Sequence, residues 1–188
     1  MTSVPATAVY AIDPDGRIAW TDDGFADLAH AYGCPHLADG SAVGRPLTDF
    51  VAGERPRALQ RELIARAQSM GAPLELRYRC DAPEMRRHAI LRLEPRPDGG
   101  VVFTTWFEAI EERPYQSLLD TDRPRGAGEV GLCAWCNRVD DGGWREVDDA
   151  AITANPPRVA HTVCEVCELL LTTRPAGGPT RSGPYGPA

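Results

Sequence analysis

Four of the six cysteines form two pairs, each with two residues between its members: Cys133 and Cys136 in "LCAWCNRVDDGGW", and Cys164 and Cys167 in "HTVCEVC". A gap of two residues lets both sulfurs of a pair point at one cation, and two such pairs complete a tetrahedron. Thiolates favour Zn²⁺ or an iron-sulfur centre, whereas Mg²⁺ and Ca²⁺ prefer oxygen ligands. The sequence therefore predicts one shared metal centre at these four cysteines.

Structural zinc is the favoured occupant of this centre. An iron-sulfur cluster is the alternative, because four thiolates can also hold such a cluster, which could serve as a redox or gas sensor. Two other interpretations are weaker: four unrelated thiols, and a dithiol/disulfide redox pair, for which neither pair has a thioredoxin-like strand and helix around it.

His161 lies three residues before Cys164 and could serve the centre in three ways. It could donate a hydrogen bond to a metal-bound thiolate, cap local backbone, or replace a cysteine as ligand. Because four thiolates already complete a site, the hydrogen-bonding role is favoured. Direct ligation would leave one cysteine over, and a catalytic metalloprotein with His161 as ligand is the corresponding alternative function.

Charge and composition exclude several function classes. The 188 residues carry a formal net charge of −7, so phosphate backbones and anionic lipid surfaces are repelled, and neither nucleic-acid nor membrane binding is expected. All 20 basic residues are arginine, which excludes the P-loop lysine, the kinase strand lysine and lysine Schiff bases. No other catalytic motif is visible, so we expect no enzyme. The chain lacks a signal-peptide pattern, which favours the cytoplasm.

The elements around the cysteines are predicted from periodicity and turn residues. Alternation of apolar and polar residues predicts strands at 7–13, 18–21, 73–80, 86–95 and 101–110. Helical spacing and capping residues predict a short helix that starts at Asp22 or Asp23 and stops at Gly33, and a longer helix at 55–70. The last three strands should form a meander beside the opening hairpin, with helices on one face of the sheet. The stretch "REVDDAAITA" between the cysteine pairs could form a further helix.

These elements predict an α+β fold in four parts. Residues 5–110 form the first domain, 111–130 a linker rich in proline, glycine and charge, and 131–171 a small zinc-finger-like module with the paired cysteines. Residues 172–188 are rich in proline and glycine and should be a disordered tail.

The first domain resembles a PAS domain, through "IDPDGRIAWTDDGFADLAHAYG" and "VGRPLTDFV" in the expected order. The resemblance implies a five-stranded antiparallel sheet whose helical face encloses a pocket, a small-molecule ligand, and homodimerisation. Cofactor-binding members of the family carry a cysteine for flavin or a histidine for haem on the long helix, and "RPRALQRELIARAQSMG" has neither. Only Cys34, Pro35 and His36 match a short element of some haem-regulated proteins, so haem is a weak alternative.

The stretch "LCAWCNRVDDGGWREVDDAAI", followed by "VAHTVCEVC", resembles a cysteine-rich module at the C-terminal end of some bacterial sensory proteins. The match includes Trp144 and His161, while Val166 replaces the usual proline. The resemblance implies a metal-binding accessory. The two resemblances together predict a small bacterial-type sensory or adaptor protein in signal transduction, acting through a protein partner.

Overall fold

A computed structural model describes residues 7–31, 34–149 and 154–173 of the chain. Five strands form the first sheet, which is antiparallel throughout and has the order β2-β1-β5-β4-β3. Their bounds are β1 Thr7–Ile12, β2 Ile18–Thr21, β3 Leu74–Arg79, β4 Met85–Pro95 and β5 Val101–Glu112. The predicted strands, the meander and its place beside the opening hairpin are confirmed, because alternation and turn residues fix strands locally.

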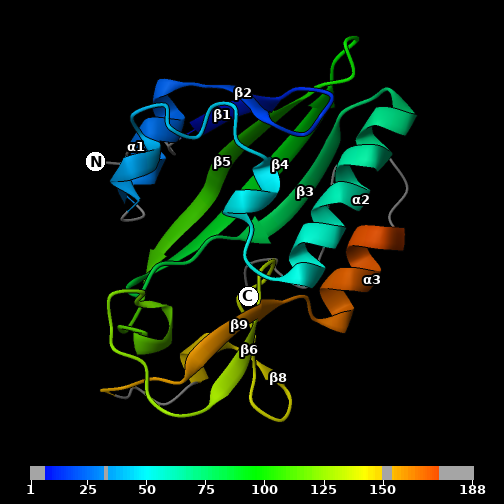
Figure 1. Cartoon of the computed structure of the whole chain (residues 1–188). Coiled ribbons are helices and arrows are strands. Elements are labelled where there is room, and N and C mark those ends of the chain that lie inside the picture. The colour runs from blue at the N-terminus through cyan, green and yellow to red at the C-terminus, as the bar shows by residue number, and fades with distance from the viewer. Residues whose placement is uncertain (1–6, 32–33, 150–153, 174–188) are drawn as a thin grey trace.

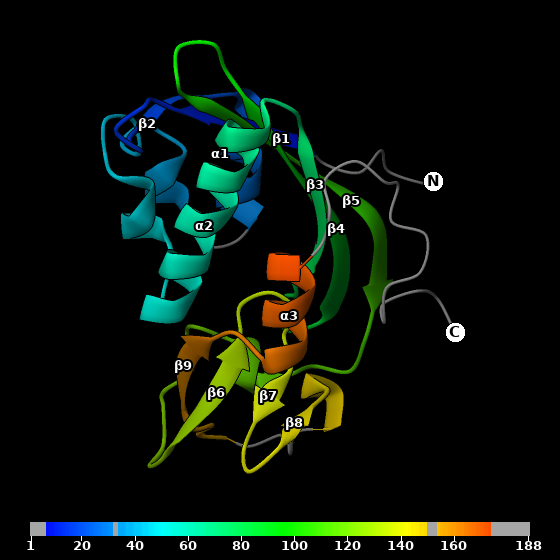
Figure 2. The same ribbon diagram turned by 90° about the vertical axis from the view of Figure 1, so that its right-hand side faces the viewer.

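Two helices cover one face of this sheet (Figures 1 and 2). The first, α1 (Asp23–Ala31), begins after Asp22, whose carboxylate accepts the backbone N–H of Phe25 at 2.8 Å and of Val9 at 2.9 Å. The second, α2 (Glu54–Met70), turns Leu59, Leu63 and Ala67 into the core. Both predicted helices are confirmed; positions 32 and 33, where α1 was expected to stop, lie outside the described residues.

The cysteine pairs lie at one end of a second, smaller sheet of order β8-β7-β6-β9, drawn at the bottom of Figure 1. Its strands are β6 Glu129–Cys133, β7 Val139–Asp140, β8 Trp144–Arg145 and β9 Arg158–Thr162, and α3 (Glu165–Thr173) follows. Within the helix expected over "REVDDAAITA", the structure has a short 3₁₀ helix at Val147–Asp149, and residues 150–153 lie outside the described ones.

The two parts share one hydrophobic cluster. It contains the four paired cysteines together with Leu59, Leu63, Leu93 and Phe103 of the larger part. The segment predicted as a linker contributes the last two residues of β5 and buries Gln116, Ser117 and Leu118. The cysteine module therefore packs against α2 and the sheet, through the apolar surface that its own small sheet cannot cover.

The C-terminal end differs in part from the predicted tail. Thr172 and Thr173, expected in the tail, are the last residues of α3, and the remainder of that predicted tail, 174–188, lies outside the described residues. Among the described residues, no helix has the length and hydrophobicity that a membrane crossing requires.

Candidate metal centre

The parallel pairing of β6 with β9 brings the two cysteine pairs together. Cys133, at the end of β6, lies opposite Thr162, the last residue of β9, and the chain then turns into α3. Cys164 precedes α3 and Cys167 lies in its first turn. Two short segments, separated by 27 residues in the sequence, thus meet at one end of the small sheet.

The first pair forms a tight knuckle. The backbone N–H of Asn137 donates to the carbonyl oxygen of Cys133 at 2.9 Å, and Asn137 adopts a left-handed conformation with φ of 58°. The N–H of Ala134 donates to the carbonyl oxygen of Thr162 at 2.8 Å, which ties the knuckle to β9. This geometry turns Cys133 and Cys136 to the same side, as the two-residue gap predicts.

The four sulfurs lie within 4.8 Å of one another, and all four cysteines are buried, with exposed fractions of 0–1%. The Sγ atoms of Cys136 and Cys164 are 3.8 Å apart. A disulfide would need about 2.05 Å, whereas around a single Zn²⁺ with Zn–S bonds of about 2.3 Å, a tetrahedron separates neighbouring sulfurs by about 3.8 Å. The donor set and its spacing fit one metal ion.

Backbone amides point at the sulfurs. The N–H of Cys164 donates to Cys133 Sγ at 3.4 Å, and the N–H of Cys167 donates to Cys164 Sγ at 3.5 Å. Hydrogen bonds from the thiols of Cys136 and Cys167, together with the Cys164 amide, lower the pKa of Cys133. The pKa of Cys136 is raised, because its thiol donates a hydrogen bond to Cys133 and so keeps its proton. Without a cation, the cluster therefore holds protons that metal binding must displace.

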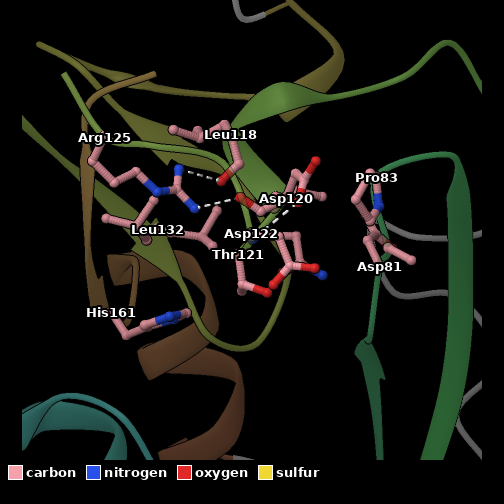
Figure 3. Close-up of a pocket in the computed structure, with 13 residues that line it drawn as sticks. Asp81, Pro83, Leu118, Asp120, Thr121, Asp122, Arg125, Leu132 and His161 are labelled. Carbon is pink, nitrogen blue, oxygen red and sulfur yellow. Dashed lines mark hydrogen bonds between the residues drawn. The ribbon is translucent and has the colours of Figure 1, made fainter. Parts of the chain in front are cut away.

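His161 does not join the sulfurs. Its side chain points into a separate pocket of about 370 Å³, on the same side of the small sheet as Leu132, its partner in β6 (Figure 3). Side chains alternate along a strand, so Leu132 and Cys133 face opposite sides. Desolvation lowers the pKa of His161, which favours the neutral form of its ring. Neither the metal-ligand role nor the thiolate hydrogen bond gains support from this position.

The pocket around His161 lies between the small sheet, the β3–β4 turn and the segment that follows β5. In Figure 3, Arg125 reaches across this segment, and its guanidinium donates to the carbonyl oxygens of Leu118 at 3.1 Å and Asp120 at 2.8 Å. The carboxylate of Asp120 accepts hydrogen bonds from Tyr115 and from the backbone of Asp122, which lower its pKa. These contacts hold the segment in place and do not reach the cysteines.

A buried ion-pair network joins the cysteine module to the larger sheet. Asp81 follows β3 and pairs with Arg79 and with Arg113, and each of these three side chains is at most 4% exposed. Arg79 continues to Glu146, after β8, and Arg113 continues to Asp148. Strand alternation predicts that Arg79 lies on a polar face; it is buried because the module covers the end of β3.

The other candidate residues lie elsewhere. Cys34 is half-buried and precedes the 3₁₀ helix Pro35–Leu37, and His36 within that helix is exposed. The three residues expected as a haem element therefore lie in a surface segment. The helix α3 was not predicted from the sequence, although Glu165 and Glu168 in its first turn are a start signal for a helix. No family model matches the chain, and no curated protein is significantly similar to it.

Proposed function

We propose that this protein is a small sensory or adaptor protein of signal transduction, in which a PAS-like domain is joined to a module held by one structural Zn²⁺ ion. The observation that carries the proposal is the set of four buried sulfurs within 4.8 Å. In this proposal Cys133, Cys136, Cys164 and Cys167 are the ligands, and the ion contributes to folding of the module.

Structural zinc is favoured over an iron-sulfur cluster by the spacing of the sulfurs. In a cluster the four thiolates are distributed over two or four iron atoms, so thiolates on different irons lie farther apart than around a single ion. All four sulfurs lie within 4.8 Å of one another, which suits a single ion. A complete shell of four thiolates, nearly closed to solvent, also leaves no position for a substrate, which favours a structural role over a catalytic one.

The sensory part of the proposal rests on the PAS resemblance. An antiparallel five-stranded sheet with helices on one face is what that resemblance implies, and the described sheet agrees with it. We place the protein in the cytoplasm, where a reducing environment keeps thiols available for zinc. We propose that it signals through a protein partner, since the chain shows no motif of a catalytic or nucleic-acid-binding output domain.

We further propose that the partner surface, and the surface for a homodimer, is the sheet face opposite to α1 and α2. Among the described residues, no helix covers this face (Figure 2). Trp106 of β5 lies there opposite Ile90 of β4, and Trp20 of β2 is 40% exposed. Light scattering of the purified protein tests this: a dimer that Trp106→Glu converts to monomer supports the surface, and a dimer that the substitution leaves intact rejects it.

Metal analysis combined with a visible spectrum tests the zinc proposal. Protein purified without oxygen should contain one equivalent of zinc and show no visible absorbance. A visible band with bound iron would instead support the alternative of a redox or gas sensor with an iron-sulfur or haem centre. Reaction of a thiol reagent with one of the four paired cysteines in the metal-loaded protein would overturn the four-thiolate assignment, and with it the structural role.

A further inference from the structure

An apolar cavity of about 110 Å³ lies where α2, the larger sheet and the cysteine module meet. Leu59 and Leu63 form its helical wall, and Leu93 and Phe103 form its wall on the sheet. These four side chains are 1–3% exposed, whereas Leu91, Ala134 and Trp135 are half-buried, so the cavity extends from the protein interior toward the surface.

The third wall of the cavity comes from the candidate metal centre. Ala134 and Trp135 are the two residues between Cys133 and Cys136, and Val163 directly precedes Cys164; all three line the cavity. Each of these wall residues is the direct neighbour of a proposed ligand in the chain. The positions of the sulfurs therefore set the shape of this wall.

The knuckle is also fixed to the edge of the larger sheet. The indole N–H of Trp135 donates to the carbonyl oxygen of Arg77 at 2.7 Å, and the ring lies 5.7 Å from that of Tyr78. A metal ion on one side and β3 on the other would hold Trp135 over the cavity. Loss of the ion removes the first of these restraints, so the cavity should lose its wall.

The lining indicates what the cavity can bind. It is apolar except for Gln60, whose Oε1 atom is buried and has no hydrogen-bond partner. A buried acceptor without a partner costs free energy that a ligand O–H or N–H could recover. An engineered apolar cavity of about 150 Å³ holds benzene, so this smaller one suits a molecule of a single ring or less.

We propose that this cavity binds a compact apolar molecule with one hydrogen-bond donor, and that this binding is coupled to metal occupancy of the four cysteines. The inference rests on the proposed function, because it requires a resident metal ion. Coupling is reciprocal: a metal ion that raises ligand affinity obliges the ligand to raise metal affinity by the same factor. The metal centre would thereby report whether the cavity is filled.

Phenol and benzene serve as a matched pair of probes, with and without the donor. Zinc-loaded protein, studied by titration calorimetry, should bind phenol saturably and roughly 5- to 10-fold more tightly than benzene, as one recovered hydrogen bond predicts. Saturating phenol should slow the release of zinc to a chromophoric chelator severalfold. This measurement starts from the loaded protein and does not depend on a folded metal-free form.

Three variants locate the effect. Leu63→Phe should fill the cavity, abolish phenol binding and remove its influence on zinc release. Gln60→Leu should make the phenol and benzene affinities equal, whereas Gln68→Leu is the control on the same helix, because Gln68 bonds the carbonyl oxygen of Gly99 away from the cavity. Zinc content is measured for each protein first, so that loss of the metal centre itself is recognised separately.

Three results would overturn the inference in protein that contains its zinc. They are the absence of saturable phenol binding, phenol binding that survives Leu63→Phe, and a zinc release rate that phenol leaves unchanged. Protein that contains no metal when purified would overturn the proposed function instead.

Discussion

The backbone N–H of Arg79 donates a hydrogen bond of 2.9 Å to the carbonyl oxygen of Trp135. Arg79 is the last residue of β3, and Trp135 lies in the middle of the first cysteine knuckle. The indole of Trp135 returns a hydrogen bond to Arg77, two residues earlier on the same strand. The knuckle is thus attached to the edge strand of the larger sheet, and changes at the cysteines and changes at this junction should affect one another.

Cys164→Ser should abolish stoichiometric metal binding. Loss of a ligand should exceed the roughly 10- to 100-fold loss of metal affinity caused by removing supporting residues at metal sites. Because a structural ion contributes folding free energy, the melting temperature should fall by about 10 °C or more. Metal analysis and thermal denaturation measure both effects.

Cys34→Ser is the matched control, because Cys34 is half-buried in another part of the chain. It should leave zinc content unchanged. Equal zinc content in Cys164→Ser and in the unaltered protein would contradict the four-thiolate site.

Gly53→Ala should weaken the contact between α2 and the cysteine module. Gly53 precedes α2 with φ of +90°, and a Cβ atom there would lie 2.2 Å from the carbonyl oxygen of His161 in β9. Gly128→Ala is the control, since Gly128 has φ of +89° and nothing within 4 Å of its added Cβ. Both variants carry backbone strain of about 1–3 kcal/mol from positive φ, and only Gly53→Ala adds the clash.

Chemical denaturation should therefore show Gly53→Ala to be less stable than Gly128→Ala by about 1–2 kcal/mol or more. Equal losses of unfolding free energy in the two variants would mean that β9 does not pack against Gly53.

Asp81→Asn should destabilise the junction strongly. Asp81 is fully buried and balances Arg79 and Arg113, so its neutralisation leaves two buried guanidinium groups short of a counter-charge. Loss of one partner from a buried pair costs about 3–5 kcal/mol. Glu108→Gln breaks the half-exposed pair with Arg77 and should cost at most about 1 kcal/mol. Denaturant unfolding that gives similar values for both would argue against the buried network.

Acid should weaken the same junction through Glu146. Burial alone would raise the pKa of Glu146, but hydrogen bonds from Arg79 and Arg138 outweigh it and lower that pKa. A lowered folded-state pKa stabilises the protein above the ordinary glutamate value of about 4.3, and this contribution is lost as the pH falls through the folded-state pKa. The stability difference between the unaltered protein and Glu146→Gln should therefore be constant near neutral pH and shrink below about pH 4.3.

Unfolding curves collected from neutral pH down to about pH 3 measure this difference. A difference that stays constant over the whole range would show that Glu146 does not keep its lowered pKa in the folded protein.

Local patterns in the sequence determined the elements of the larger sheet and the grouping of the cysteines. Alternation fixes which side of a strand is apolar, so the range 18–21 was predicted to the residue and α2 to within one residue. The two-residue gap likewise predicts that each pair turns its sulfurs to one side. Such signals involve neighbours in the chain, and no tertiary contact is needed to interpret them.

The surroundings of these elements depended on tertiary structure. Arg79 has the spacing of a surface residue on β3, yet it is buried, because Glu146 and the rest of the module cover it only when the module docks. His161 is near Cys164 in sequence, but β9 pairs with β6 and presents His161 on the side of Leu132, away from the sulfurs. Pairing between strands that are distant in sequence decides which side chains become neighbours in space. The sequence pattern of one strand does not identify the strand that pairs with it.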